Sequence, residues 1–190
     1  MLLILDTETS GLLRDDLAAE DPSQPHLVQL GAQLFSQDGT KRGHLNVLIK
    51  PDGWSIEPQA QQVHGIDVQV CHRFGVDVVF ALGVLQGMVG CAARIVAHNM
   101  NFDRKVIASA IHRAGGTGLW WQRAGSRMFC TMEAATPVLK LEGKFGHKFP
   151  SLTEAMAGLC PDYPFVERHD ADSDVAATAE LYRALQRQAA

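Results

Sequence analysis

The sequence predicts an α/β fold in which helices cover a central sheet. An apolar run at residues 1–5 is too short for a membrane span and is typical of a strand buried on both faces. Two further strand patterns follow, with hairpin residues between them, which predicts an antiparallel meander of three strands. Residues 94–113 then have the pattern of a strand, a turn and a helix, which supplies one of the covering helices.

Length and charge limit the classes of protein that fit. With 190 residues, 46% of them hydrophobic, the chain suits one domain over residues 1–190. Its net charge of -4 argues against a tight, non-specific duplex binder, so local basic patches and bound metal would hold any nucleic acid. The four cysteines form no C-x-x-C pair and no secretory leader precedes the first strand, so we expect a reduced, cytoplasmic location. No stretch approaches the roughly 20 apolar residues of a membrane span.

The first half of the chain carries the meander. Residues 14–25 are polar and acid-rich without a sustained period, which predicts an exposed loop; a lid or a strand guide is the alternative. Strand patterns at 26–35 and 44–49 flank the hairpin residues Gln37-Asp38-Gly39-Thr40. We therefore expect the first three strands to pair antiparallel.

Helical patterns dominate after residue 58. The remaining expected elements are, in chain order, a short helix at 58–63, a helix at 76–88 weakened by Gly83 and Gly87, a strand at 94–97, a helix at 102–113, a short apolar piece at 128–130, a helix at 131–139, a helix from a Ser151–Glu154 capping box to about Leu159, and a last helix from near His169 to the C-terminus.

One region is locally basic. Lys140, Lys144, His147 and Lys148 alternate with Phe145 and Phe149. This composition fits a patch that binds the phosphates of a nucleic-acid strand, and an ordinary solvated loop is the alternative.

Two acids end the first strand. Side chains alternate across a strand, so Asp6 and Glu8 point to the same face, roughly 7 Å apart. Two carboxylates this close perturb each other's protonation unless a positive group lies between them. A divalent cation such as Mg²⁺ or Mn²⁺ meets that need, whereas the alternative is that both acids merely begin a polar loop.

Two more acids and a histidine complete the candidate site. Asp103 lies in the first turn of the 102–113 helix, where it either joins the site or only favours the helix dipole. Asp174 shares the apolar stripe of the last helix, so it needs a partner such as a shared metal. Asp170 suits capping at the helix start, and Asp172 should face elsewhere. His169 could act as a general base near neutral pH, although a histidine at a helix start is more often a surface residue.

Together these groups predict a two-metal phosphodiesterase. Carboxylates from three separated segments could hold two divalent ions about 4 Å apart, which activate water and stabilise the leaving 3′ oxygen at phosphorus.

The motifs also resemble those of a known family. Asp6-Thr7-Glu8, the segment from Asn99 to Asp103, and His169-x-x-x-x-Asp174 are similar to the motifs of the DEDDh 3′-to-5′ exonucleases. The strongest resemblance is to the epsilon proofreading subunit of bacterial DNA polymerase III and its relatives. It implies a ribonuclease H-like fold with a mixed five-stranded sheet, its first three strands antiparallel, and two Mg²⁺ or Mn²⁺ ions.

The resemblance also implies roles for individual residues. Asp6, Glu8 and Asp174 would hold the ion that activates water, Asp103 would support the second ion, and His169 would be the base. The terminal nucleotide would meet the residues Thr9, Gly11, Leu12, His64 and Phe102. The match extends through Leu48–Asp52 to Val63-His64-Gly65-Ile66. The chain departs from the family at Gln59, where proofreading relatives often carry a glutamate that contacts the 3′ hydroxyl.

These observations predict an exonuclease that removes 5′-mononucleotides from the 3′ ends of single-stranded or frayed DNA. An RNA-trimming relative is the first alternative, because discrimination rests on a few contacts to the 2′ position. A catalytically silent module bound to nucleic acid or to a polymerase is the second. Whether the chain acts alone or binds a DNA polymerase stays open at this point, and no membrane partner is expected.

Overall fold

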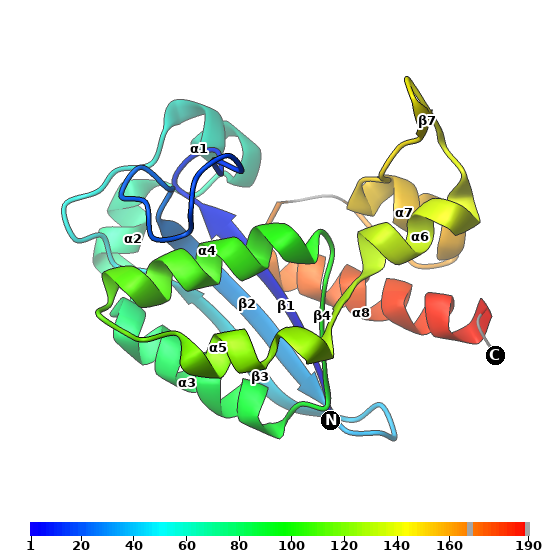
Figure 1. The fold of residues 1–190 in the computed structure, drawn as a ribbon, viewed down its shortest axis with the longest axis horizontal. Helices are drawn as coiled ribbons and strands as arrows, with labels where there is room; N and C mark the ends of the chain where they lie inside the picture. Colours follow the sequence, from blue (N-terminus) through cyan, green and yellow to red (C-terminus); the bar gives the residue numbers. More distant parts are fainter. Residues whose placement is uncertain (167–168, 189–190) are drawn as a thin grey trace.

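A five-stranded mixed sheet forms the centre of the structure, a computed structural model that describes residues 1–166 and 169–188 (Figure 1). The strands are β1 (Leu2–Thr9), β2 (Leu27–Phe35), β3 (Lys41–Leu48), β4 (Arg94–Ala97) and β5 (Met128–Cys130). Their order is β3-β2-β1-β4-β5; β2 pairs antiparallel with β1 and β3, while β4 runs parallel to β1 and β5. The predicted ribonuclease H-like fold class is therefore confirmed, including the antiparallel meander.

Helices cover both faces of the sheet. They are α1 (Pro58–His64), α2 (Val68–Phe74), α3 (Val78–Cys91), α4 (Met100–Arg113), α5 (Leu119–Arg123), α6 (Thr131–Leu139), α7 (Leu152–Leu159) and α8 (Ala171–Gln188), with a 3₁₀ turn at Gly125–Arg127 and a two-stranded hairpin of β6 (Glu142–Gly143) and β7 (Gly146–His147). The last two residues of the predicted final helix lie outside the described residues.

The alternation of side chains along β1 divides the core into two layers. Leu3 and Leu5 pack into a large apolar cluster with α3 and α4, whereas Ile4 packs with Val175 and Ala179 of α8. Every second side chain therefore turns toward the same helical layer. A separate apolar cluster joins α6, α7 and the second half of α8, from which the β6–β7 hairpin projects (Figure 1).

Three expectations about local structure need correction. The helix predicted at 76–88 begins only at Val78, because Val76 bridges to Ile49 in extended backbone and the Asp77 side chain caps the helix by accepting from the Val79 amide. The helices α2 and α5 and the β6–β7 hairpin were not predicted. They are short, with two to seven residues per element, so little periodicity marks them.

The acid-rich segment after β1 is an ordered loop, as its lack of periodicity predicted. The buried Gln24 side chain donates to the carbonyls of Arg14 and Ala18 at 2.8 and 3.0 Å, and Arg113 of α4 donates to the Pro25 carbonyl at 2.9 Å. These bonds fold the loop onto itself and fasten it to α4. Separately, no helix in the described ranges is long and apolar enough to span a membrane.

Candidate active site

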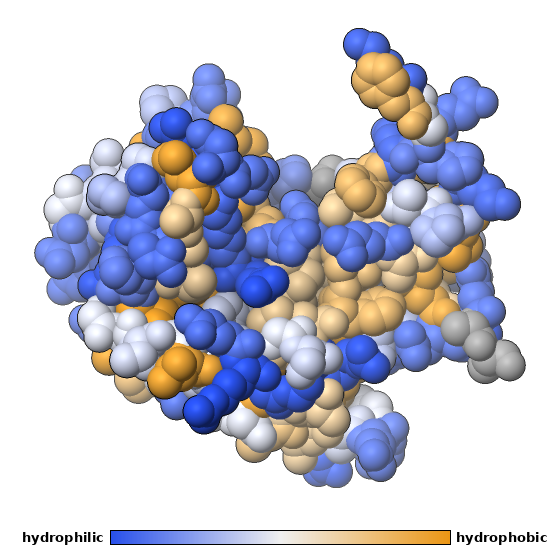
Figure 2. All heavy atoms as spheres, viewed as in Figure 1, coloured by the Kyte–Doolittle hydropathy of each residue, from blue (hydrophilic) through white to orange (hydrophobic). Residues whose placement is uncertain are grey.

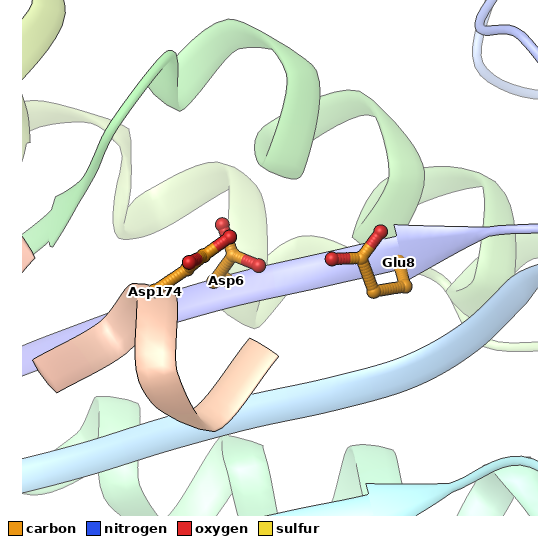
Figure 3. Close-up of side chains that lie close together, drawn as sticks. All are labelled: Asp6, Glu8 and Asp174. Atoms are coloured by element: carbon orange, nitrogen blue, oxygen red, sulfur yellow. The ribbon is translucent and has the colours of Figure 1, made fainter. Parts of the chain in front are cut away.

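Three carboxylates meet at the end of β1 (Figure 3). Asp6 and Glu8 come from alternate positions of the strand, and Asp174 comes from the first turns of α8. One carboxylate oxygen from each residue lies within 4.8 Å of the others. The structure thus brings together residues 166 or more positions apart in the chain, which is the arrangement that the spacing predicted.

Helix α8 reaches this position because its apolar face rests on the sheet. Asp174 shares its buried side with the predicted stripe of Ala177, Thr178, Leu181, Ala184 and Leu185. The start of the helix also comes very close to β2 at Gly31, the residue paired with Asp6. A Cβ at Gly31 would lie 2.6 Å from the Ala171 carbonyl oxygen, so only glycine permits this approach.

Asp103 enters the site from the opposite helical layer. It lies in the first turn of α4, directly after β4, and it is 1% exposed. The Thr7 hydroxyl donates to Asp103 Oδ1 at 2.9 Å, whereas Oδ2 is buried and accepts no hydrogen bond from the described residues. A buried carboxylate oxygen in this state is costly unless a further group, such as a cation, binds there.

The four acids repel one another. Burial raises the pKa of Asp6 well above its usual value, and Asp103, Glu8, Asp174 and Asp170 raise it further. Burial and then Asp174, Asp103 and Asp170 raise the pKa of Glu8 to about 8. Burial also raises the pKa of Asp103 to about 8, although the hydrogen bond from Thr7 acts in the other direction. A divalent cation bound between these carboxylates would therefore relieve their mutual repulsion.

Two histidines, His64 and His169, lie near each other, and His64 contacts the end of β1. His169 lies two residues before α8, half-buried, with a left-handed φ of 48°. His64, at the end of α1, is buried; its Nδ1 accepts from the Ile66 amide at 3.0 Å, so its Nε2 must donate to the Thr9 carbonyl at 3.2 Å. Burial lowers the pKa of His64, the hydrogen bond to Thr9 raises it, and the nearby His169 lowers it. The hydrogen bond to Thr9 links α1 to the end of β1.

The residues predicted to meet the terminal nucleotide do not all behave alike. Leu12 is 78% exposed and lines a groove of about 590 Å³ together with Phe102. Thr9 is buried and donates to the Gly11 carbonyl at 2.8 Å. Gln59 is exposed on α1. Their roles stay predictions.

Sequence reasoning missed Glu57. A Cβ at Gly11 would lie 2.6 Å from the Glu57 carboxylate, and the Glu57 amide donates to the Ser10 carbonyl at 2.8 Å. The carboxylate therefore lies against the turn that follows β1, two residues before the position where the family often has its glutamate. The only signal in the sequence was this proximity to Gln59.

Asp170 and Asp172, which the sequence placed outside the metal site, have hydrogen-bond partners on the sheet. Asp170 accepts from Gln29 Nε2 at 3.1 Å, and the side-chain oxygen Oε1 of Gln29 accepts from the Ala171 amide at 3.2 Å. Gln29 thus satisfies the first amide of α8, and the capping role expected for Asp170 stays a prediction. Asp172 faces β2 and β3 rather than the cluster, as predicted. Its Oδ1 accepts from Gln33 Nε2 at 3.0 Å and lies 2.6 Å from His44 Nε2.

A ribonuclease H-like sheet with an acidic cluster at the end of its central strand defines a class of nucleases. The chain belongs to the exonuclease family: the family model described as "RNase_T: Exonuclease" matches residues 3–182. A search of curated protein sequences gives no match.

Solved structures of similar fold are also exonucleases. E. coli exonuclease I in complex with a dT13 oligonucleotide is 19% identical, with a TM-score of 0.74 over 98% of this chain and 40% of that chain. Exonuclease X in complex with 5′ overhanging duplex DNA is 23% identical, with a TM-score of 0.66 over 99% of this chain and 92% of that one. The chain thus spans about two fifths of the exonuclease I chain. At these identities the likeness shows the fold.

Proposed function

We propose that the chain is a metal-dependent exonuclease that removes 5′-mononucleotides from the 3′ ends of single-stranded or frayed DNA. The observation that carries this proposal is the meeting of Asp6, Glu8 and Asp174 within 4.8 Å, with the buried Asp103 close enough to raise the pKa of Asp6. Carboxylates this close favour a divalent cation between them.

The donor set fits Mg²⁺ or Mn²⁺. Both ions prefer carboxylate oxygens, and the site offers four carboxylates but no thiol. Asp6, Glu8 and Asp174 would hold one ion; Asp6 and Asp103, whose Oδ2 is buried without a hydrogen bond from the described chain, would hold a second. When bound, two such ions supply an activated water and stabilise charge on the leaving oxygen.

The protein's own groups account for the remaining steps. His169 takes the proton from the attacking water, whose oxygen forms a bond to the terminal phosphorus. The bond from phosphorus to the 3′ oxygen of the preceding nucleotide breaks, and that oxygen gains a proton as the new 3′ hydroxyl. The products are a 5′-monophosphate and a strand shorter by one nucleotide.

The surroundings of the site support a single-stranded end as substrate. The exposed Leu12 and the half-buried Phe102 line the same groove, where apolar side chains can stack on the last base. Glu57 lies against the turn at Gly11 and offers a hydrogen-bond acceptor for the terminal sugar. In the family pattern this acceptor is a glutamate at the position that Gln59 occupies here. Both similar structures contain DNA, a dT13 oligonucleotide in one and a 5′ overhanging duplex in the other, and this chain is proposed to act on DNA as well.

Shortening of labelled oligonucleotides tests the proposal. With Mn²⁺, a 5′-labelled single strand should shorten one nucleotide at a time, whereas a 3′-labelled strand should release labelled mononucleotide at once. A matched RNA strand should react more slowly. Asp6→Ala should be inactive: shortening by this variant would indicate a contaminant, and no shortening by the native protein would indicate a binding module. A polymerase partner, which the resemblance to the epsilon subunit suggests, would be tested by co-purification.

A further inference from the structure

The β6–β7 hairpin is a basic projection with an aromatic tip. Glu142 pairs with His147 and Gly143 pairs with Gly146, so Lys144 and Phe145 form the two-residue loop. In Figure 1 the hairpin extends away from α6 and α7, and in Figure 2 its tip stands clear of the rest of the surface. Its side chains at the tip therefore contribute little to the core.

Phe145 is unusually exposed for a large apolar side chain. It is 94% exposed, and the Lys144 ammonium lies 5.2 Å from the centre of its ring. Aromatic side chains are normally buried, because exposure gives up the free energy of burying their apolar surface. An aromatic ring offered to solvent beside a cation has the composition of a platform on which nucleobases stack.

The base of the hairpin is fixed to the turn that precedes α4. Phe149, just after β7, lines the groove of about 590 Å³ that also contains Leu12 and Phe102. The next residue, Pro150, accepts through its carbonyl from His98 Nε2 at 3.0 Å, and His98 lies in the turn between β4 and the helix that carries Asp103. The hairpin thus rises from one wall of a groove whose lining also includes Asn101 and Phe102, the residues that precede Asp103 on α4.

Charge further narrows what the hairpin can bind. Lys148 is engaged by Glu154 of the α7 capping box, which leaves Lys140 and Lys144 as exposed cations beside the ring. An acidic peptide would match the lysines alone, whereas a nucleic-acid strand matches both the lysines and the ring. Phosphates match the lysines, and bases match the ring.

We propose that the hairpin binds the nucleic-acid strand upstream of the scissile phosphate, with Phe145 stacking on a base and Lys144 beside a phosphate. The proposal rests on the exonuclease function proposed above. Phe145 and Phe149 are four positions apart, a reach of roughly 13 Å at the rise of a strand. A strand stacked with the duplex rise of about 3.4 Å per nucleotide would meet Phe145 roughly four nucleotides beyond the groove, and an extended strand would meet it after fewer.

Strand length separates this contact from the catalytic site. Steady-state hydrolysis of a dT3 and a dT12 oligonucleotide would be compared for the native protein, Phe145→Ala and Phe145→Trp. We expect Phe145→Ala to raise KM for dT12 by about 5- to 30-fold, with kcat and the KM for dT3 within about twofold of native. Phe145→Trp should restore native values, because indole also stacks.

The chain supplies a matched control. Phe74, at the end of α2, is 65% exposed and has the Arg73 guanidinium 5.1 Å from its ring, yet it does not line the groove. Phe74→Ala should leave both KM values unchanged. Equal changes in KM for dT3 and dT12, or none in Phe145→Ala, would overturn the proposal.

Binding without turnover keeps the two proposals apart. In a chelator, fluorescence anisotropy of labelled dT12 should show the same 5- to 30-fold loss of affinity in Phe145→Ala. If the native protein hydrolyses neither strand but shows this loss, the exonuclease proposal fails and the hairpin contact stands. If hydrolysis occurs and the native protein and Phe145→Ala bind dT12 equally well, the hairpin proposal fails and the exonuclease proposal stands.

Discussion

Two groups of acids surround the start of α8, and the protein treats them differently. Asp170 and Asp172 each receive a side-chain donor from the sheet, Gln29 for the first and Gln33 with His44 for the second. Asp6 and Glu8 lie on the neighbouring strand β1, where burial and the nearby carboxylates all raise their pKa. The sheet therefore supplies hydrogen-bond donors to Asp170, to Asp172 and, through Thr7, to one oxygen of Asp103, whereas neighbouring carboxylates raise the pKa of Asp6 and Glu8.

This contrast indicates that the cluster is shaped for a ligand rather than for stability. Burying like charges costs free energy, which hydrogen bonds of the kind given to Asp172 would reduce. In the metal-free protein, the cost falls on the native state. The comparison can be tested by altering each group in turn.

The largest expected effect is that of Asp6→Asn. Removing one charge from the centre of the cluster should lower kcat by about 10³-fold or more, because the site acts as a unit. The metal-free variant should at the same time unfold at a higher temperature than the native protein, since repulsion is relieved. A variant that keeps the native rate would remove Asp6 from the mechanism.

His169→Ala should have the next largest effect. Loss of a general base should lower kcat by roughly 10²- to 10⁴-fold while the carboxylates still bind metal. The thermal shift produced by Mn²⁺ should therefore stay close to native. An undiminished rate near neutral pH would show that another group accepts the proton.

The stability of the metal-free protein should fall as the pH rises from about 5 to 8. In this interval unfolded carboxyls have lost their protons, whereas Glu8 and Asp103, each with a pKa of about 8, still hold theirs in the folded state. The native state binds more protons, so raising the pH favours unfolding. We expect the melting temperature to drop by several degrees and Mn²⁺ to restore it. A metal-free melting temperature that rises over this interval would contradict the electrostatic account.

The smallest effect is expected for Asp172→Asn, the matched control for the cluster. It removes an acid two residues from Asp174 on the same helix, but one bonded to Gln33 and His44. Unfolding free energy should fall by about 1 kcal/mol, and kcat should change less than twofold. A large loss of activity would mean that the two groups of acids are not separate.

Local patterns predicted much of this molecule. The strand of β4 and the helix α6 lie where their periodicity placed them, and the Ser151 capping box forms as expected. The alternation of side chains along β1 placed Asp6 and Glu8 on one face, and the apolar stripe of α8 identified Asp174 as a buried acid. These signals are local, because they depend on the repeat of a strand or a helix.

The contacts that sequence reasoning missed are not local. The Gln29 side chain accepts from the first amide of α8 across 142 positions of the chain. Glu57 approaches Gly11 only because α1 folds back on the end of β1. No repeat within either segment records such an approach, so only the assembled structure shows it.

Gly31 gives the site an unexpected weak point. It carries no functional group, yet the distance between the sheet and the backbone at Ala171 depends on its missing side chain. A methyl group there would act as a spacer that lifts the start of α8 and separates Asp174 from its partners on β1. A substitution at Gly31 would therefore disrupt the carboxylate cluster even though Asp6, Glu8 and Asp174 are themselves unchanged.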